Sequence, residues 1–162
     1  MDGAGLDEIE TVYRRRLPEL IRVTTAIVGS REAGLDAVQD AFALAVHRRA
    51  QFRREGALEA WLWRIVVRTS RDVAAKTWTN RMVAADERIE SADEPTDVRD
   101  DDVHTLVRQL PEGQRLALFL HYYADLDYGT IADALEIKDG TVGALLNQAR
   151  ESLRQSMAEV TS

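Results

Sequence analysis

Apolar residues recur at helical spacing along almost the whole chain, and this periodicity limits the fold more than any other feature. Steps of three or four separate the large apolar side chains over residues 6–27, and the same steps return over 35–46, 58–73, 103–123 and 131–153. Such spacing places apolar side chains on one face of an α-helix. No stretch of useful length alternates in the manner of a half-buried strand. The sequence therefore predicts an all-α protein.

Local signals divide the periodic segments into helices. Pro18 is expected to kink or break the first helix, because proline removes a backbone hydrogen bond and clashes with the preceding turn. Gly29 is suited to end that helix, and Ser30 to cap the next one. A polar, basic loop over 51–56 separates the second apolar stripe from the third, which is expected to run to about Trp78.

An abrupt change of composition divides the chain into two parts. Residues 86–102 carry many acids, one proline and few large apolar side chains, which is typical of a linker. We therefore expect two small helical domains, over residues 1–80 and 103–162, joined by a flexible acidic linker over 81–102.

The charge of the chain is unevenly distributed. The net charge of −7 argues against a nucleic-acid partner, but residues 48–81 hold nine Lys or Arg against three acids. A local basic stripe attracts phosphate even on an acidic chain, because the field is screened over about 10 Å. The stripe is consistent with a polyanion footprint, and the alternative is an ordinary solvated helical face.

Several classes of function are disfavoured by composition. The chain has no cysteine, and its three histidines are far apart with no ligand spacing around them, so no metal site is expected. No nucleophile–base pair or phosphate loop is visible, so no enzymatic activity and no cofactor are expected. No apolar run approaches the roughly 20 residues of a membrane span, and the acidic N-terminus is unlike a signal peptide. We expect a cytoplasmic protein without a membrane partner.

The segment from Asp127 to Arg154 predicts a helix-turn-helix. Asp127 is suited to cap a short helix, residues 136–139 form a tight turn with Ile137 as an apolar plug, and Thr141 opens a longer helix. A short helix, a compact turn and a second helix form the unit that places its second helix in the DNA major groove. An ordinary pair of packed antiparallel helices is the alternative.

Two sets of motifs lie in order along the chain. The first half carries Tyr13-Arg14-Arg15, Asp36-Ala37-Val38-Gln39-Asp40-Ala41-Phe42, Phe52-Arg53 and Ala60-Trp61-Leu62-Trp63-Arg64-Ile65. The second half carries Leu110-Pro111-Glu112 with Arg115, then Tyr128, Ile131-Ala132, Gly140-Thr141-Val142, Ala149-Arg150 and Leu153-Arg154. The first set resembles region 2, and the second resembles region 4, of the extracytoplasmic-function sigma factors of bacterial RNA polymerase. The resemblance covers roughly residues 8–80 and 100–155.

This resemblance implies a docking surface for core RNA polymerase on the second helix. The implied polar contacts are Asp36, Gln39 and Asp40, with Phe42 in the core. Acids on one helical face can meet arginines of a partner. Taken without the family, Asp36 and Asp40 are equally consistent with a solvated face.

The resemblance also implies contacts with promoter DNA in both halves. The implied residues for the minus-10 element, where a strand is displaced and held, are Gln51, Phe52, Arg53, Arg54, Trp63, Arg64, Arg68, Arg71 and Lys76. Trp61 is expected in the core, whereas Trp63 is the candidate to line the strand path. The implied residues for the minus-35 element are Thr141, Ala144, Leu145, Asn147, Gln148 and Arg150.

The last helix departs from the family pattern. Basic or polar residues usually follow Gly-Thr-Val, whereas Gly143, Ala144 and Leu145 stand there, and the helix from 139 to 154 has zero net charge. Duplex affinity depends strongly on phosphate neutralisation, which puts minus-35 reading in doubt. Leu146 takes the core position, so Leu145 is expected to point outward.

Three functions remain open at this point. The first is a working alternative sigma factor with core polymerase and promoter DNA as partners; the resemblance adds an anti-sigma protein, although many family members lack one. The second is a sigma-like decoy or auxiliary subunit that has lost minus-35 reading. The third is a dimeric helix-turn-helix repressor, which leaves the first set of motifs unexplained. A double alanine change at Arg68 and Arg71 separates the first two.

Overall fold

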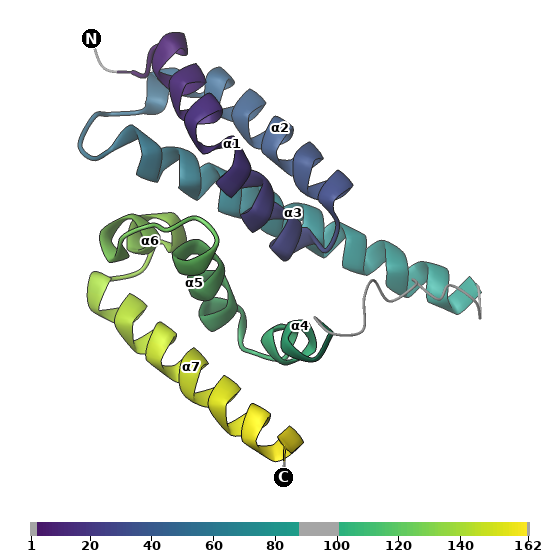
Figure 1. Ribbon diagram of the computed structural model, residues 1–162. Coiled ribbons are helices and arrows are strands. Elements are labelled where there is room, and N and C mark those ends of the chain that lie inside the picture. The colour runs from purple at the N-terminus through teal and green to yellow at the C-terminus, as the bar shows by residue number, and fades with distance from the viewer. Residues whose placement is uncertain (1–2, 88–100, 162) are drawn as a thin grey trace.

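The computed structural model describes residues 3–87 and 101–161, and within these ranges the protein is helical without strands (Figure 1). The first part comprises α1 (Leu6–Val28), α2 (Arg31–His47), the short 3₁₀ helix η1 (Arg49–Gln51) and α3 (Leu58–Glu87). The second part comprises α4 (Asp101–Arg108), α5 (Glu112–Tyr122), α6 (Tyr128–Leu135) and α7 (Asp139–Thr161). The prediction of an all-α fold with two helical units is confirmed.

The first cluster is a bundle of α1, α2 and α3, in which each helix packs on the other two. Its centre is formed by the apolar stripes that the sequence pattern marks. Fully buried members include Leu20, Val23, Val38, Leu62 and Val66. Apolar burial of this kind supplies most of the favourable free energy of a small helical domain.

The turn between α1 and α2 forms as the sequence predicts. Gly29 ends α1 in a left-handed conformation with φ 98°, and the Ser30 hydroxyl accepts a hydrogen bond of 3.2 Å from the Ala33 amide. Pro18 does not break α1, which is one helix from Leu6 to Val28. Pro18 lies on the exposed side of the helix, while Leu20 and Val23 are buried beyond it. Their packing offsets the lost backbone hydrogen bond.

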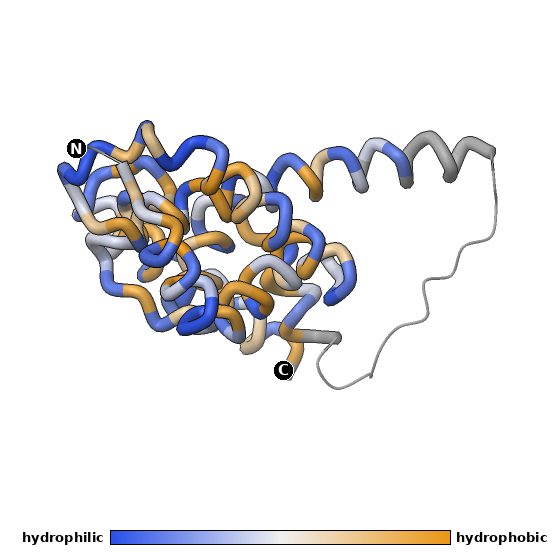
Figure 2. Tube along the Cα trace, turned by 90° about the horizontal axis from the view of Figure 1, so that it is seen from above, coloured by the Kyte–Doolittle hydropathy of each residue, from blue (hydrophilic) through white to orange (hydrophobic). Residues whose placement is uncertain are grey.

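Helix α3 is longer than the sequence analysis expects. It continues past Trp78 to Glu87, because residues 79–87 contain neither glycine nor proline to stop it. The coloured part of α3 already projects beyond the other helices before its last turns (Figure 2). The expected linker over 81–102 is therefore partly helical at its two ends, and its residues 88–100 lie outside the described part of the chain.

The second cluster is built around α5, which contacts both α6 and α7. Five consecutive residues of α5, from Leu116 to Leu120, are buried, so this stretch of the helix is covered on all sides. The pair α6 and α7 forms the predicted helix-turn-helix. Asp127 caps α6, because its carboxylate accepts a hydrogen bond of 2.7 Å from the Thr130 amide, and this bond lowers the pKa of Asp127.

The two clusters lie against each other along α3 (Figure 1). Helix α6 packs on the N-terminal half of α3, and α5 makes a smaller contact with α1. The short turn of the helix-turn-helix is therefore brought next to the segment with the highest positive charge. No helix in the described ranges is both long enough and apolar enough to cross a membrane.

Helices α1 and α2 cross at very short range beside Gly34. A Cβ atom at this position would lie 2.7 Å from the backbone nitrogen and from the hydroxyl oxygen of Thr25. Real Cβ atoms do not approach backbone so closely, and a rigid helix backbone cannot move aside cheaply. Gly34 thus sets the distance between the two helices.

We expect Gly34→Ala to lower the free energy of unfolding by about 1–3 kcal/mol, although alanine is the better helix former. Urea denaturation of the full chain measures this value. The matched control is Gly140→Ala on α7, where nothing lies within 4 Å of the added Cβ and stability should stay nearly unchanged. Equal midpoints for the two variants would show that the α1–α2 crossing is looser than described.

Candidate nucleic-acid interface

The loop before α3 is anchored at both of its ends. Helix η1 precedes it, and the Arg49 carbonyl accepts a hydrogen bond of 2.9 Å from the Ala4 amide. Phe52 is buried and packs on Trp61, with ring centroids 5.5 Å apart. The loop is therefore held on the first turn of α3 by an aromatic pair.

A hollow of about 340 Å³ opens between this loop and α3. Its walls include exposed Arg53, half-buried Trp61 and half-buried Arg64, together with Asp133 from α6. The other lining residues are Gln51, Phe52, Glu55, Gly56, Ala57 and Ala60. An aromatic wall with cationic side chains beside it can hold an unstacked base and its phosphates.

One aromatic assignment made from the sequence is wrong. Trp63 is only 1% exposed and lies in the bundle core, so it cannot line a strand path; Trp61 lines the hollow instead. Phe52 is buried against Trp61 and also lines the hollow, so its assignment to the DNA contacts stays a prediction. The sequence spacing could have indicated the position of Trp61. Trp61, Arg64 and Arg68 are separated by steps of three and four, which places them on one face of a helix.

The tip of the loop is tied to α1 by an ion pair. Arg54 adopts a left-handed backbone with φ 57°, and its guanidinium donates to the Glu8 carboxylate with contacts of 2.7 and 3.1 Å. The bond from Arg54, assisted by the Gly5 amide, lowers the pKa of Glu8 from an ordinary 4.5 to about 2. Arg54 thus supports the loop, whereas Arg53 and Gln51 remain exposed beside the hollow.

The basic face of α3 is covered by acidic groups of the second cluster. The Arg68 guanidinium donates hydrogen bonds to the Glu136 carboxylate. Its Nη2 lies 2.7 Å from both oxygens, and its Nε lies 3.2 Å from Oε2. The Arg64 Nε donates to the Asp133 carbonyl at 3.1 Å. Lys76, farther along the helix, is exposed.

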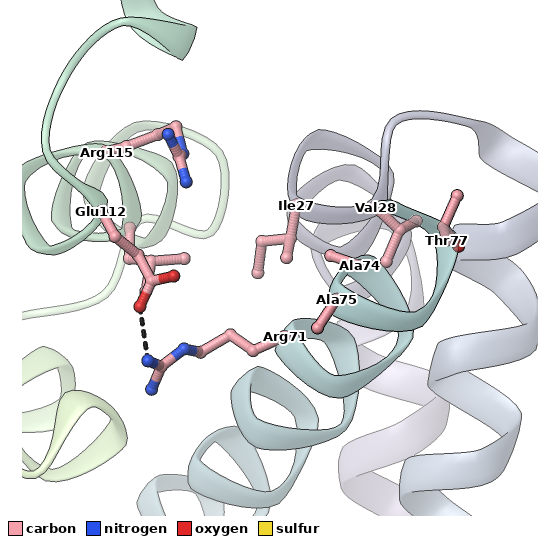
Figure 3. A pocket seen from close by; sticks show the side chains of 9 residues that line it. Ile27, Val28, Arg71, Ala74, Ala75, Thr77, Glu112 and Arg115 are labelled. Carbon is pink, nitrogen blue, oxygen red and sulfur yellow. Dashed lines mark ion pairs between the residues drawn. The ribbon is translucent and has the colours of Figure 1, made fainter. Parts of the chain in front are cut away.

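A third pair spans a groove between the two clusters. Arg71 reaches across to Glu112, at the start of α5, in a groove of about 370 Å³ (Figure 3). Apolar groups from both clusters form the other wall, among them Ile27, Val28 and Leu116. Three arginines of α3 that the sequence assigns to DNA therefore contact the second cluster.

The exposed ridge of α7 carries most of the residues assigned to the minus-35 element. Thr141, Ala144, Asn147 and Gln148 are exposed along it. The Gln148 side chain also meets Gln114 of α5, with a hydrogen bond of 3.4 Å. This ridge offers amide groups suited to reading adenine, and little charge.

The expected outward orientation of Leu145 is wrong. Its side chain is half-buried against the core and lies over Gly113 of α5, where a Cβ atom would be 3.6 Å from it. The flank of α7 that carries Leu145 faces the start of α5, because α5 has a glycine there that leaves room. Leu145 therefore packs within the cluster instead of forming an apolar surface spot.

The opposite flank of α7 holds one arginine in a fixed position. The Arg150 Nε donates a hydrogen bond of 2.9 Å to the Tyr122 hydroxyl, and its guanidinium lies 5.7 Å from the centre of that ring. The bond with Tyr122 raises the pKa of Arg150 above its ordinary value. Nη1 also lies 3.5 Å from the Asn147 side-chain oxygen. Arg150 is thus oriented toward the exposed ridge.

Sequence reasoning missed Tyr122 and Glu136 as members of this interface. Tyr122 is more than half exposed, and the His121 ring centre lies 4.8 Å from that of Tyr122 and 5.9 Å from that of Tyr128. No local pattern links Tyr122 to Arg150 or Glu136 to Arg68, since each pair joins different helices. Helical periodicity reports the face of one element only.

The polar residues of α2 form a separate surface. Gln39, Asp36 and Asp40 are exposed on one side of the helix. No hydrogen bond or ion pair engages their side chains within residues 3–87 and 101–161. In the same ranges, no cluster of three or more His, Asp or Glu side chains is placed to hold a metal ion.

Comparison with known families matches both halves of the chain. Residues 12–80 match the family described as Sigma-70 region 2, and residues 100–153 match Sigma-70, region 4. Both matches occur in the order in which the two helical clusters follow one another. Together they span most of the described chain.

Relatives that match nearly the whole of this chain agree with these matches. The chain is 26% identical to the RNA polymerase sigma-H factor of Pseudomonas aeruginosa, over 96% of this chain and 88% of that protein. It is also 26% identical to the ECF RNA polymerase sigma factor SigE of Mycolicibacterium smegmatis, over 99% of this chain and 66% of that protein.

Two solved structures share the fold. One is CnrH in complex with the cytosolic domain of CnrY, with a TM-score of 0.72, 19% identity, and coverage of 98% of this chain and 92% of that one. The other is the sigma factor RpoE with the anti-sigma factor NepR from Bartonella quintana, with a TM-score of 0.71, 21% identity, and coverage of 94% and 98%.

Acid should release the loop tip from α1. A carboxylate with a lowered pKa stabilises the fold above its unfolded pKa, and this contribution is lost as the pH falls from about 4.5 toward 2. We expect an NMR titration of Glu8 to give a midpoint near 2, and Arg54→Ala to return that midpoint toward 4.5. A midpoint near 4.5 in the unmodified chain would show that the Glu8–Arg54 pair does not form in solution.

Proposed function

The chain belongs to the sigma-70 family as an extracytoplasmic-function sigma factor, and from that premise we propose how its residues divide the work of promoter recognition. The protein binds core RNA polymerase and directs it to promoters; the polymerase, not this chain, carries out the chemistry. We assign residues 1–80 to polymerase docking and the minus-10 element, residues 81–102 to the linker, and residues 103–162 to the minus-35 element.

The observation that carries the minus-10 assignment is the hollow beside the basic face of α3. Trp61 forms an aromatic wall, Arg53 and Arg64 stand at its edge, and Arg68 and Arg71 continue along the helix. A flipped base is held by stacking, and the strand that carries it is held through its phosphates. Gln51 and Lys76 extend the same surface at its two ends.

We assign recognition of the minus-35 element to the exposed ridge of α7. Thr141, Ala144, Asn147 and Gln148 face outward, and Arg150 is the one cation of this set. With so few charges, binding should depend on amide contacts to base edges and on the fixed position of Arg150. Tyr122 contributes as a positioning residue, because its hydroxyl accepts the hydrogen bond from Nε and leaves Nη1 directed at the ridge.

Location and further partners follow from the same assignment. We place the protein in the cytoplasm, where core polymerase and promoter DNA are found. The RpoE structure that shares this fold was solved with an anti-sigma factor. A protein inhibitor of that kind is therefore a candidate partner for this chain as well.

Transcription with purified core polymerase on pooled genomic fragments of the source organism tests the function. Mapped RNA 5′ ends should include new starts that share an upstream minus-10 motif when the protein is added. A shared minus-35 block would support the assignment of α7. Polymerase binding without new starts would contradict the assignment and favour the decoy function.

If α2 docks on core polymerase, removing its acidic side chains should weaken binding to the polymerase. We expect Asp36→Asn combined with Asp40→Asn to weaken binding to core polymerase about tenfold or more, because two charge-assisted contacts are removed. Biolayer interferometry with immobilised core enzyme measures this effect. The thermal midpoint should not change, since neither side chain has an intramolecular partner in the described chain. Asp7→Asn on α1 is the control; equal affinity of all three proteins would exclude α2 as the docking helix.

Positioning of Arg150 by Tyr122 predicts a coupled effect on duplex binding. We expect Tyr122→Phe to weaken binding to a mapped minus-35 duplex about threefold to tenfold, since one hydrogen bond to a charged group is lost. In an Arg150→Ala background the same change should have little further effect. Tyr123→Phe is the control, because its ring stacks on Phe119. Additive losses in the double variant would refute the positioning role.

A further inference from the structure

The segment before α1 lies against η1 and the loop that follows it. Ala4 is only 6% exposed and belongs to the apolar core, and its amide donates a hydrogen bond of 2.9 Å to the Arg49 carbonyl. The same carbonyl accepts a bond of 3.3 Å from the Phe52 amide. One oxygen thus serves both the start of the loop and the segment before α1, since a carbonyl has two lone pairs. The two segments are therefore held in one position relative to each other.

Gly3 allows this close approach. Its backbone has φ 124°, which side chains disfavour, and a Cβ atom there would lie 3.3 Å from the Arg49 carbonyl oxygen and 3.4 Å from the Ala50 Cα. The atoms met are backbone atoms, which cannot move aside as a flexible side chain can. A larger residue at position 3 would therefore push the segment away from η1.

A second contact holds the tip of the loop. The Glu8 carboxylate accepts hydrogen bonds from the Gly5 amide at 2.7 Å and from two nitrogens of Arg54 at 2.7 and 3.1 Å. Arg54 has the left-handed conformation, with φ 57°, which is unfavourable for a residue with a Cβ atom. Its guanidinium also lies 5.9 Å from the centre of the Phe52 ring. The contacts of Arg54 thus help to offset the cost of the turn that shapes the loop.

The loop forms one wall of the hollow described above, and α3 forms the other. Gln51, Arg53 and residues 55–57 line it from the side of the loop, whereas Trp61 and Arg64 line it from α3. None of residues 3–8 is among the residues that line it. The width of the hollow therefore depends on a loop whose position is set by residues outside the hollow.

We propose that residues 3–8, here called the loop clamp, determine the specificity of the minus-10 site by fixing the width of the hollow that holds a base. This inference rests on the proposed function, because it takes the hollow to receive a base of the minus-10 element. The loop clamp acts by positioning, without contact with DNA. A fixed wall favours the base that fits and excludes the others, whereas a loose wall lowers the difference between them.

The two parts of the loop clamp differ in strength. The side chains of Arg54 and Glu8 remain 48% and 44% exposed, and exposed ion pairs contribute little. Buried Ala4 adds apolar contact and a backbone hydrogen bond at the start of the loop, where Phe52 also packs on Trp61. Loss of the ion pair should therefore loosen the tip of the loop, and bulk at position 3 should loosen its start as well.

Hydrogen exchange of the free full chain tests the loop clamp without DNA. We expect Glu8→Gln to speed exchange of peptides that cover residues 49–57 about threefold to fivefold, and Gly3→Val to speed it more, while peptides of α2 keep the parent rates. Glu10→Gln is the matched control, since it removes an ion pair of 2.8 Å with Arg14 on the same helix. Unchanged exchange of the loop in both variants would overturn the proposal.

Initiation by the holoenzyme, reconstituted with core polymerase, tests specificity. The rate is measured on a promoter mapped with the parent chain and on versions with each single-base change in the minus-10 motif. For Glu8→Gln and Gly3→Val, the ratio of the preferred to the changed base should fall about threefold to tenfold at the position that the hollow holds. Glu10→Gln should keep the parent ratios. An equal fall of all rates, with every ratio unchanged, would reduce the loop clamp to a structural role and overturn its part in specificity.

A double variant separates the ion pair from other effects of its two members. Arg54→Ala should lower the ratio as Glu8→Gln does, and the two changes together should lower it no further. Additive losses would overturn the assignment of the Glu8–Arg54 pair to the loop clamp. Failure of the sigma function itself would appear separately, as absent promoter-specific starts with the parent chain.

Discussion

One helix, α3, supplies both core residues and the charged surface of the first cluster. The arrangement of the other helices depends on these two faces of α3. Trp63 points into the bundle, while Arg64 and Arg68 point away from it. The helical period fixes the angle between the two faces, so the helix cannot turn its arginines elsewhere without removing Trp63 from the core. Any change in the availability of the basic face has to come from what covers it.

The contacts within and between the clusters differ in kind. Within each cluster the helices are joined by buried apolar side chains such as Leu62 and Leu120, which exclude water. Between the clusters, exposed ion pairs such as Arg68–Glu136 lie beside the packing of α6 on α3. The buried residues of the two clusters form one continuous hydrophobic core, so the charged contacts lie at the edge of an apolar one.

Much of the fold can be predicted from the sequence because it depends on interactions between residues that are close in the chain. The stripes, the Ser30 and Asp127 caps and the helix-turn-helix all rest on interactions within a few residues. The orientation of Leu145 was misjudged, because it depends on the space left by Gly113 on another helix. Trp63 is in the core and not on the strand path, whereas Trp61 packs against the core and also lines the hollow. Glu136 was not recognised, because its partner lies 68 residues away and no periodicity spans that separation.

The placement of the aromatic side chains has an optical consequence. Trp63 is sealed in the bundle, where its emission reports whether the first cluster is folded. Trp61 stands at the wall of the hollow, beside Arg64 and under the reach of α6, where a stacked base would quench an indole. Two of the chain's three tryptophans therefore lie two residues apart in sequence, one placed to report unfolding and the other to report occupancy of the hollow. Their fluorescence can follow both events in the unlabelled protein.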